Sequence, residues 1–269
     1  MNRADKDAPI EKAMKGAFGT RWAAVHANLA MVRLERGNLL EAEHDFRQVD
    51  RVLKEIGPST SYVRNQGWIA RVQYFVGQKD KALESYVRIL APENQDLNAR
   101  ARSMFFRHRA ELHRSQGRFE SALEDLDTSY SIAASGDHLD QMSATHVSRI
   151  YTKFMQEQGK GSFKQIDPEI AFARRTGLLK LEANFCRVQA RIALAQGYPE
   201  VAFRLALRST EIVNYNGVLL DLTASLAVLG QSAASLLKVE IAQDILLQAL
   251  RLADRQDYIQ HRSLVERSL

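Results

Sequence analysis

Small residues return every forty positions along this chain, and this period constrains the fold more than any other feature of the sequence. Three series share the period: Gly37, Gly77, Gly117 and Gly197; Ala42, Ala82, Ala122, Ala202 and Ala242; and Ala30, Ala70, Ala110, Ala190 and Gly230. Self-similarity at one period of this size is typical of solenoids, in which each repeat packs only on its neighbours. We therefore expect one elongated domain without a single central core.

Each unit predicts two helices. Apolar residues recur at helical spacing before Gly37, and a second amphipathic run with Ala42 and Phe46 follows it. Gly37 suits the left-handed turn that ends a helix, and Asn38 followed by Glu41 predicts a cap on the next one. No apolar–polar alternation of the kind expected for strands occurs, so we predict an all-α fold.

The repeated residues resemble a known family, the tetratricopeptide repeat (TPR). The resemblance is carried by Leu29, Ala30, Gly37, Ala42 and Phe46; by Ile69, Ala70, Gly77, Ala82 and Tyr86; by Ala110, Gly117, Ala122 and Leu126; and by Ala190, Gly197 and Ala202. The forty-residue unit is similar to the longer repeats of bacterial maltose-activator-type regulators and kinesin light chains. The resemblance implies a right-handed α-solenoid of about six TPR-like helix pairs, with short capping helices at both ends.

The period also divides the chain. We expect an N-terminal capping segment at residues 1–20, an array over residues 21–256 and a C-terminal capping helix at residues 257–269. Units are expected near residues 21–58, 59–95, 96–136, 137–177, 178–216 and 217–256. The fourth unit departs from the pattern, because its glycine has moved to Gly159 and a loop precedes Asp167 and Pro168, which should be the cap and the first turn of a shortened second helix. In the sixth unit Leu237 stands where glycine is expected.

Composition limits the class of protein. The chain has 269 residues, 45% of them hydrophobic, and a net charge of +5. A single cysteine, Cys186, argues against a disulfide framework, and the first 18 residues have no apolar core of signal-peptide length, so we expect a cytoplasmic protein. Residues 218–239 are the most apolar window, but charged and polar residues interrupt it, so we expect a buried helix and no membrane insertion.

No pattern indicates catalysis, a cofactor or a metal site. His108 and His113 do not share a helical face, and no cysteine or carboxylate cluster completes a ligand set. The stretch "QGKGS" lacks the spacing of a phosphate-binding loop, and "GQSAA" is one residue short of a nucleophile elbow. Cys186 occupies a core position, where a thiol is expected to pack. We therefore predict a protein that is not an enzyme.

The resemblance implies a binding surface, because the first helix of each unit in such arrays lines a concave groove. Mapping from the glycines places ten residues there: Arg64, Trp68, Arg71, Arg107, His108, Arg114, Arg149, Lys153, Arg187 and Arg191. The predicted first helices together carry net positive charge, whereas the second helices carry net negative charge. The groove is therefore predicted to be basic, although solvated arginines, or an Arg107–Glu111 pair within one helix, would produce the same pattern.

We interpret the chain as a non-catalytic scaffold or adaptor that binds an acidic peptide segment of a protein partner, since arginine pairs well with carboxylates. Two alternatives remain open. The basic groove could bind nucleic acid, although few aromatic residues accompany its cations. The chain could also be the sensory or oligomerisation part of a larger bacterial signalling or transcription regulator.

The sixth unit predicts a different surface. Its groove positions are small and uncharged: Ala224, Ala227, Val228, Gln231, Ala234 and Ser235. Such a surface could receive an amphipathic helix or a second copy of the chain, giving a homo-oligomer. Packing against the closing helix at residues 257–269 is the other interpretation.

Overall fold

The computed structural model describes residues 19–57, 59–92, 97–256 and 258–266, and all of their regular structure is helical. The elements are α2 (Gly19–Glu35), α3 (Leu39–Ile56), α4 (Thr60–Phe75), α5 (Lys79–Ile89), α6 (Ala99–Ser115), α7 (Phe119–Ser135), α8 (Leu139–Gln156), the 3-10 helix η2 (Phe163–Ile166), α9 (Asp167–Arg175), α10 (Leu179–Ala195), α11 (Pro199–Tyr215), α12 (Leu219–Ser235), α13 (Val239–Arg255) and α14 (Ile259–Glu266). The all-α prediction is confirmed. Most of the expected N-terminal capping segment, residues 1–18, lies outside the described residues.

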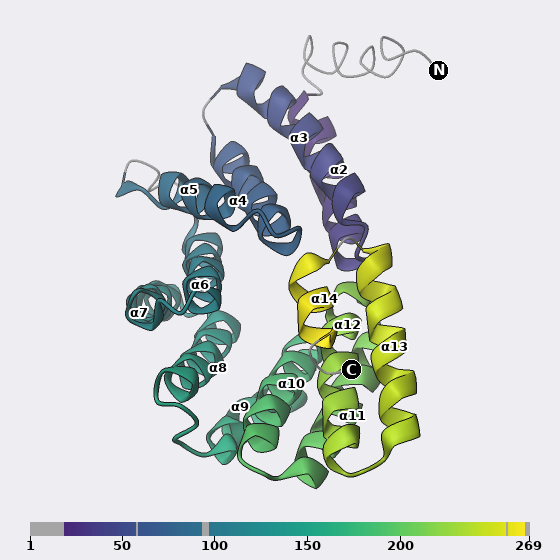
Figure 1. The fold of residues 1–269 in the computed structure, drawn as a ribbon. Coiled ribbons are helices and arrows are strands. Elements are labelled where there is room, and N and C mark those ends of the chain that lie inside the picture. The colour runs from purple at the N-terminus through teal and green to yellow at the C-terminus, as the bar shows by residue number, and fades with distance from the viewer. Residues whose placement is uncertain (1–18, 58, 93–96, 257, 267–269) are drawn as a thin grey trace.

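The helices pack pairwise along the chain (Figure 1). We call α2, α4, α6, α8, α10 and α12 the first helices, and α3, α5, α7, α9, α11 and α13 the second helices. Each first helix contacts its own second helix and the second helix of the preceding pair. Short turns impose this antiparallel arrangement, because a chain that reverses within a few residues has to pack on the helix it has just left.

Left-handed turns also occur between pairs, where the forty-residue period does not predict them. Asp137, Gly177 and Gly217 have φ of 52°, 68° and 67° and repeat the backbone hydrogen bonds of the turn at Gly37, whereas Gly57 combines φ 112° with ψ 178° and is a different kind of connection. In the first turn the amide of Gly37 donates to Leu34 O and the amide of Asn38 donates to Arg33 O. The cap predicted for Asn38 is wrong: its side chain makes no capping hydrogen bond, and its backbone, at φ −80° and ψ 68°, is not in the extended conformation typical of a capping residue.

The two irregular units have the predicted character. In the fourth, the turn falls at Gln158 and Gly159, and η2 precedes an α9 of only nine residues. Asp167 is the first residue of α9 rather than its cap, with Pro168 in the first turn. In the sixth, Leu237 takes the left-handed conformation itself, at φ 60°.

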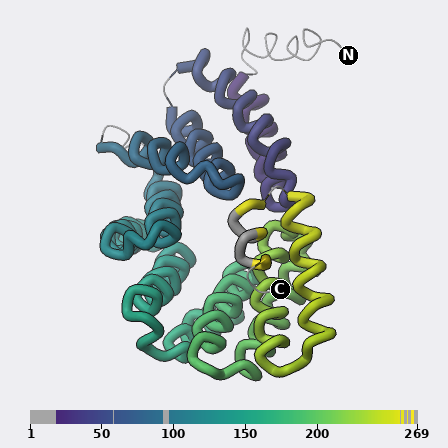
Figure 2. Tube along the Cα trace, in the orientation of Figure 1, coloured from purple at the N-terminus to yellow at the C-terminus, as the bar shows by residue number. Residues whose placement is uncertain are grey.

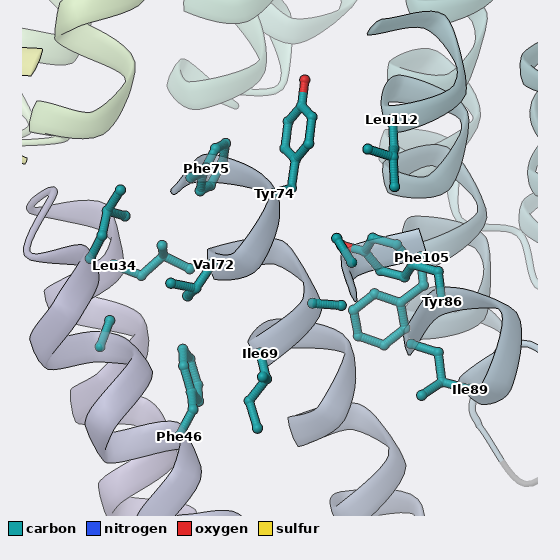
Figure 3. Packing of buried hydrophobic residues seen from close by; sticks show 14 of the residues in the cluster. Leu34, Phe46, Ile69, Val72, Tyr74, Phe75, Tyr86, Ile89, Phe105 and Leu112 are labelled. Carbon is teal, nitrogen blue, oxygen red and sulfur yellow. The ribbon is translucent and has the colours of Figure 1, made fainter. Parts of the chain in front are cut away.

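Small residues mark the points where helices cross. Ala42, Ala82, Ala122 and Ala202 are each 0% exposed, and Ala242 is 3% exposed. Large side chains fill the adjoining space, as Phe46, Tyr86 and Phe105 do between the first three pairs (Figure 3). The apolar residues form several clusters along the array instead of one centre, as expected of a solenoid.

The array bends until its two ends meet (Figure 2). Helix α2 contacts α12, and α14 contacts α4 as well as α12 and α13. Near this junction Lys180 Nζ lies 2.5 Å from Glu35 Oε1, which joins the start of α10 to the end of α2. The expectation of an open, elongated domain is therefore wrong: the helix pairs form a ring that the C-terminal residues close.

The apolar window at residues 218–239 is mostly α12, which is buried over most of its length in the ring. None of the described helices combines the length and the apolar character needed to cross a bilayer.

Candidate functional site

Neighbouring first helices place residues forty positions apart side by side. Arg71 on α4 lies 2.7 Å from Glu111 on α6, and Arg100 on α6 lies 2.5 Å from Asp140 on α8. The repeat period therefore sets the distance along the chain between partners on the lining of the ring. Figure 1 shows the first helices from α4 to α10 towards the centre of the ring, with α5 and α7 outside them.

Three of the predicted arginines gather around one carboxylate. We call Arg71, Arg107, Glu111 and Arg114 the arginine cluster. Burial disfavours ionisation of Glu111, but Arg71, Arg114 and Arg107 outweigh it and lower the pKa of the carboxyl. Burial also disfavours the charged form of Arg71, yet Glu111 raises the pKa of its guanidinium above the ordinary value. Glu111 thus neutralises one of the three positive charges.

Arg107 has the least compensated charge in the cluster. Its strongest contact is a 3.4 Å hydrogen bond from Nη2 to Gln141 Oε1, and its buried Nε has no partner. No described carboxylate forms an ion pair with it. Burial, with Arg71 as the largest charge acting on it, lowers the pKa of Arg107 to about 10. A half-buried guanidinium without a carboxylate is costly, so this position favours an anion.

Arg114 likewise forms no ion pair with a carboxylate of the described residues. Its Nη1 donates to Thr152 Oγ1 at 3.2 Å, and its guanidinium lies 5.0 Å from the centre of the Tyr151 ring. These contacts orient the side chain but do not neutralise it. The cluster therefore retains positive charge facing the interior of the ring.

Two further buried polar atoms beside the cluster have no hydrogen-bond partner, His108 Nδ1 and Tyr86 Oη. The rings of His108 and Tyr86 contact each other, with centres 6.4 Å apart. Buried polar atoms are normally satisfied, so unpaired groups next to an unbalanced charge indicate a place where a ligand can bind.

His108 and Trp68 have a packing role as well. His108 is 7% exposed and sits among Trp68, Phe105 and Tyr86. Burial, with the charges of Arg71 and Arg107, lowers the pKa of His108 well below its ordinary value, so the ring is neutral. Trp68 is half-buried and meets Phe105 edge to face at 5.9 Å.

Arg149 and Lys153 line a separate pocket of about 360 Å³ beside the irregular fourth unit. Lys160, Gln165 and Phe154 also line it. The pocket exists because a turn and a short 3-10 helix replace the start of a regular second helix there. Arg149 is partly neutralised by Asp127, at 3.3 Å, whereas Lys153 is exposed.

The remaining predicted residues do not join either group. Arg187 Nη1 binds both the carboxylate and the backbone carbonyl of Asp221, at 3.0 and 3.2 Å. Arg64 is exposed near the start of α4, and Arg191 is half-buried on α10. The predicted row of arginines is therefore divided into one half-buried cluster, one pocket and three separate side chains.

The predicted apolar surface of the sixth unit is largely covered. Ala224, Ala227 and Val228 are at most 1% exposed, whereas Ala234 and Ser235 are exposed. Val265 of α14 is fully buried among residues of α12 and α13. The structure thus agrees with packing against the closing helix.

Sequence reasoning missed two features of the site. It considered a pair of Arg107 with Glu111 only as an alternative to the basic groove and did not foresee that Glu111 pairs with Arg71 of the preceding unit. Arg71 and Glu111 are 40 positions apart, which equals the repeat period, and this spacing could have indicated the pair. It also missed Tyr258, which is 5% exposed and packs edge to face on Phe75 at 5.0 Å. No local signal predicts that contact, because it joins the two ends of the array.

Comparison with known proteins identifies the fold as a TPR-like solenoid of pairwise-packed helices. A Rap protein in complex with competence and sporulation factor matches with a TM-score of 0.66 and 14% identity, over 98% of this chain and 78% of that one. A signal-transduction ATPase with numerous domains and a tetratricopeptide repeat sensor, from Pyrococcus horikoshii, matches with a TM-score of 0.56 and 15% identity, over 90% of this chain and 37% of that one. No protein-family model and no curated protein matches the sequence.

Proposed function

We propose that this protein is a non-catalytic interaction module that binds an acidic peptide segment of a partner on the inner face of its ring. The observation that carries the proposal is the guanidinium of half-buried Arg107, which forms no ion pair with a described carboxylate, has a buried Nε without a partner and lies close enough to Arg71 and Arg114 to feel their charges. A carboxylate from a bound peptide would supply the missing negative charge and could accept hydrogen bonds from more than one guanidinium.

The similar solved structures are consistent with this kind of role. The Rap protein was solved with a bound factor, so a solenoid of this shape is able to hold another molecule. The Pyrococcus protein carries its repeats as the sensor of a larger chain, which supports a second candidate, a sensory module of a larger regulator. Both candidates require a ligand-binding inner face.

The test compares Arg107→Gln with Arg204→Gln. Both substitutions remove one positive charge, but Arg204 is exposed on the second helix α11. We would measure binding of fluorescent acidic peptides by anisotropy, with neutral peptides of equal length and single-stranded oligonucleotides as competitors. Arg107→Gln is expected to weaken acidic-peptide binding by roughly tenfold or more, because charged hydrogen bonds contribute about 1.5–3 kcal/mol. Arg204→Gln should bind as the native protein does.

Stability separates loss of a ligand contact from damage to the fold. Removing a buried charge that has no opposite partner should leave the free energy of unfolding unchanged or raise it. Equal acidic-peptide affinity in the two variants would refute the proposal. If an oligonucleotide of the same charge as the peptide displaced it and bound more tightly, nucleic acid would be favoured as the ligand.

A further inference from the structure

One side chain at the end of the sixth pair takes part directly in the junction that closes the ring. Gln256 follows α13 and is 5% exposed. Its Nε2 donates to Leu219 O at 3.0 Å, and Thr223 Oγ1 donates to its Oε1 at 3.1 Å. These two bonds hold the amide against the turn at Gly37, where a Cβ atom would lie 2.5 Å from Gln256 Cδ. The turn of the first pair therefore docks on Gln256 only because residue 37 has no side chain.

Two residues farther along, Tyr258 reaches the arginine cluster from the opposite end of the chain. It packs on Phe75, and the face of Phe75 lies 4.3 Å from the guanidinium carbon of Arg71. Tyr258 is also near enough to Arg71 and Glu111 for their charges to act on its hydroxyl. Arg71, which Glu111 and Phe75 contact directly, has only 15% of its side chain exposed.

We propose that Gln256, Tyr258 and α14 form a reversible cover over the Arg71 side of the arginine cluster, so that the ring has to open before a ligand can use Arg71. This proposal rests on the proposed function for the identity of the ligand. The cover itself is a property of the chain without ligand and can be tested separately.

The contacts that close the ring are few and partly exposed, which makes opening accessible. The Glu35–Lys180 pair has 41% and 57% of its side chains exposed, and exposed pairs of this kind contribute little to stability. Helix α14 has only eight residues, a length at which a helix depends on its packing. Local opening of such an element costs less free energy than unfolding of the whole array.

Two glycines provide a matched pair of variants. Gly37 and Gly117 occupy equivalent turns with φ of 79° and 74°, so an alanine meets the same backbone strain at each. At Gly117 no atom lies within 4 Å of an added Cβ, whereas at Gly37 the Cβ collides with Gln256. Gly37→Ala should therefore open the ring, and Gly117→Ala should not. Tyr258→Ala is a second opening variant that leaves the turn intact.

Two ligand-free measurements report the opening. Spin labels at Lys54→Cys on α3 and Gln248→Cys on α13, both exposed positions, give the separation of the ends by pulsed electron resonance. Cys186 does not compete for label, because it is buried and burial raises the pKa of its thiol to about 11. Reaction with phenylglyoxal, followed by mass spectrometry, reports access to Arg71, with exposed Arg64 on the same helix as the internal reference.

We expect Gly37→Ala and Tyr258→Ala to lengthen the label distance and to raise the reactivity of Arg71 relative to Arg64 by roughly fivefold to tenfold. Gly117→Ala should match the native protein in both measurements. Unchanged Arg71 reactivity in both opening variants would overturn the proposal, whatever the label distance. If Gly37→Ala does not fold, Tyr258→Ala alone decides.

Peptide binding then separates this proposal from the proposed function. Tighter binding of an acidic peptide to the opened variants supports both. Raised Arg71 reactivity with no peptide binding in any variant establishes the cover and refutes the acidic-peptide function.

Discussion

Arg107 and His108 are neighbours in the sequence, but the sequence predicted their roles in the site to different extents. Arg107 was predictable, because the repeat period places it on a first helix with other arginines. Its importance was not, since the missing carboxylate partner depends on Glu111 turning to Arg71. For His108 the sequence suggested a groove residue, whereas three aromatic side chains from two units enclose it. Contacts between units decide the role of each residue.

His108 makes stability depend on pH. Its folded-state pKa is well below the ordinary value, so the unfolded chain, which protonates this ring near pH 6.5, binds more protons as the pH falls. The free energy of unfolding should therefore decrease below about pH 7, with up to about 1.4 kcal/mol per pH unit from this residue. His108→Phe should flatten the dependence in urea denaturation between about pH 5.5 and 7.5. His44→Gln, at an exposed position, serves as the control. If the free energy of unfolding of His108→Phe depended on pH as steeply as that of the native protein, the assignment to His108 would be contradicted.

Amphipathic spacing predicts the individual helices well, whereas glycine spacing predicts only some of the turns between them. Amphipathic spacing predicted paired helices, and the recurring glycines predicted left-handed turns. The sequence reading overlooked the turns at Gly177 and Gly217 because they repeat at the boundary between pairs, where no alanine series marks them. At Leu237 the turn persists without glycine, because packing of α12 on α13 imposes the conformation.

Leu237→Gly should stabilise the protein. The side chain is 86% exposed, so its removal loses little packing, and glycine relieves a left-handed strain of about 1–2 kcal/mol. The greater entropy of glycine in the unfolded chain offsets part of this gain, which leaves roughly 0.5–1 kcal/mol. Gly217→Leu is the reverse change at an equivalent turn with open space around it, and should destabilise. Chemical denaturation measures both; shifts of the same sign would refute the explanation.

At the scale of the whole molecule, the curvature of the array brings together residues that the repeat pattern treats as unrelated. Gln256 meets Gly37, and Tyr258 meets Phe75. Small rotations between successive units accumulate along a solenoid, so its ends can meet although each unit contacts only its neighbours. The ring therefore gives the C-terminal residues access to the inner face of the second and third pairs.

Charge exchange across the junction should change the shape of the ring without much change in stability. Lys180→Glu places a second acid beside Glu35 and should lengthen the distance between labels at positions 54 and 248. Because the pair is exposed, the free energy of unfolding should change by less than about 1 kcal/mol, and added salt should reduce the effect. Glu35→Lys combined with Lys180→Glu should restore the native distance. A double variant as open as the single one would show that this pair does not help to close the ring.

The sequence by itself determined the helices, their pairing and the candidate lining of the inner face, because these depend on periods of a few residues or of one repeat. The tertiary structure alone decided which arginines of the cluster are paired with a carboxylate, which are not and what covers them. Those outcomes depend on contacts between units and between the two ends of the chain, such as Arg71 with Glu111 and Tyr258 with Phe75. The repeat pattern in the sequence describes how one unit packs on the next. The place where the two ends meet depends on the sum of the small rotations between successive units.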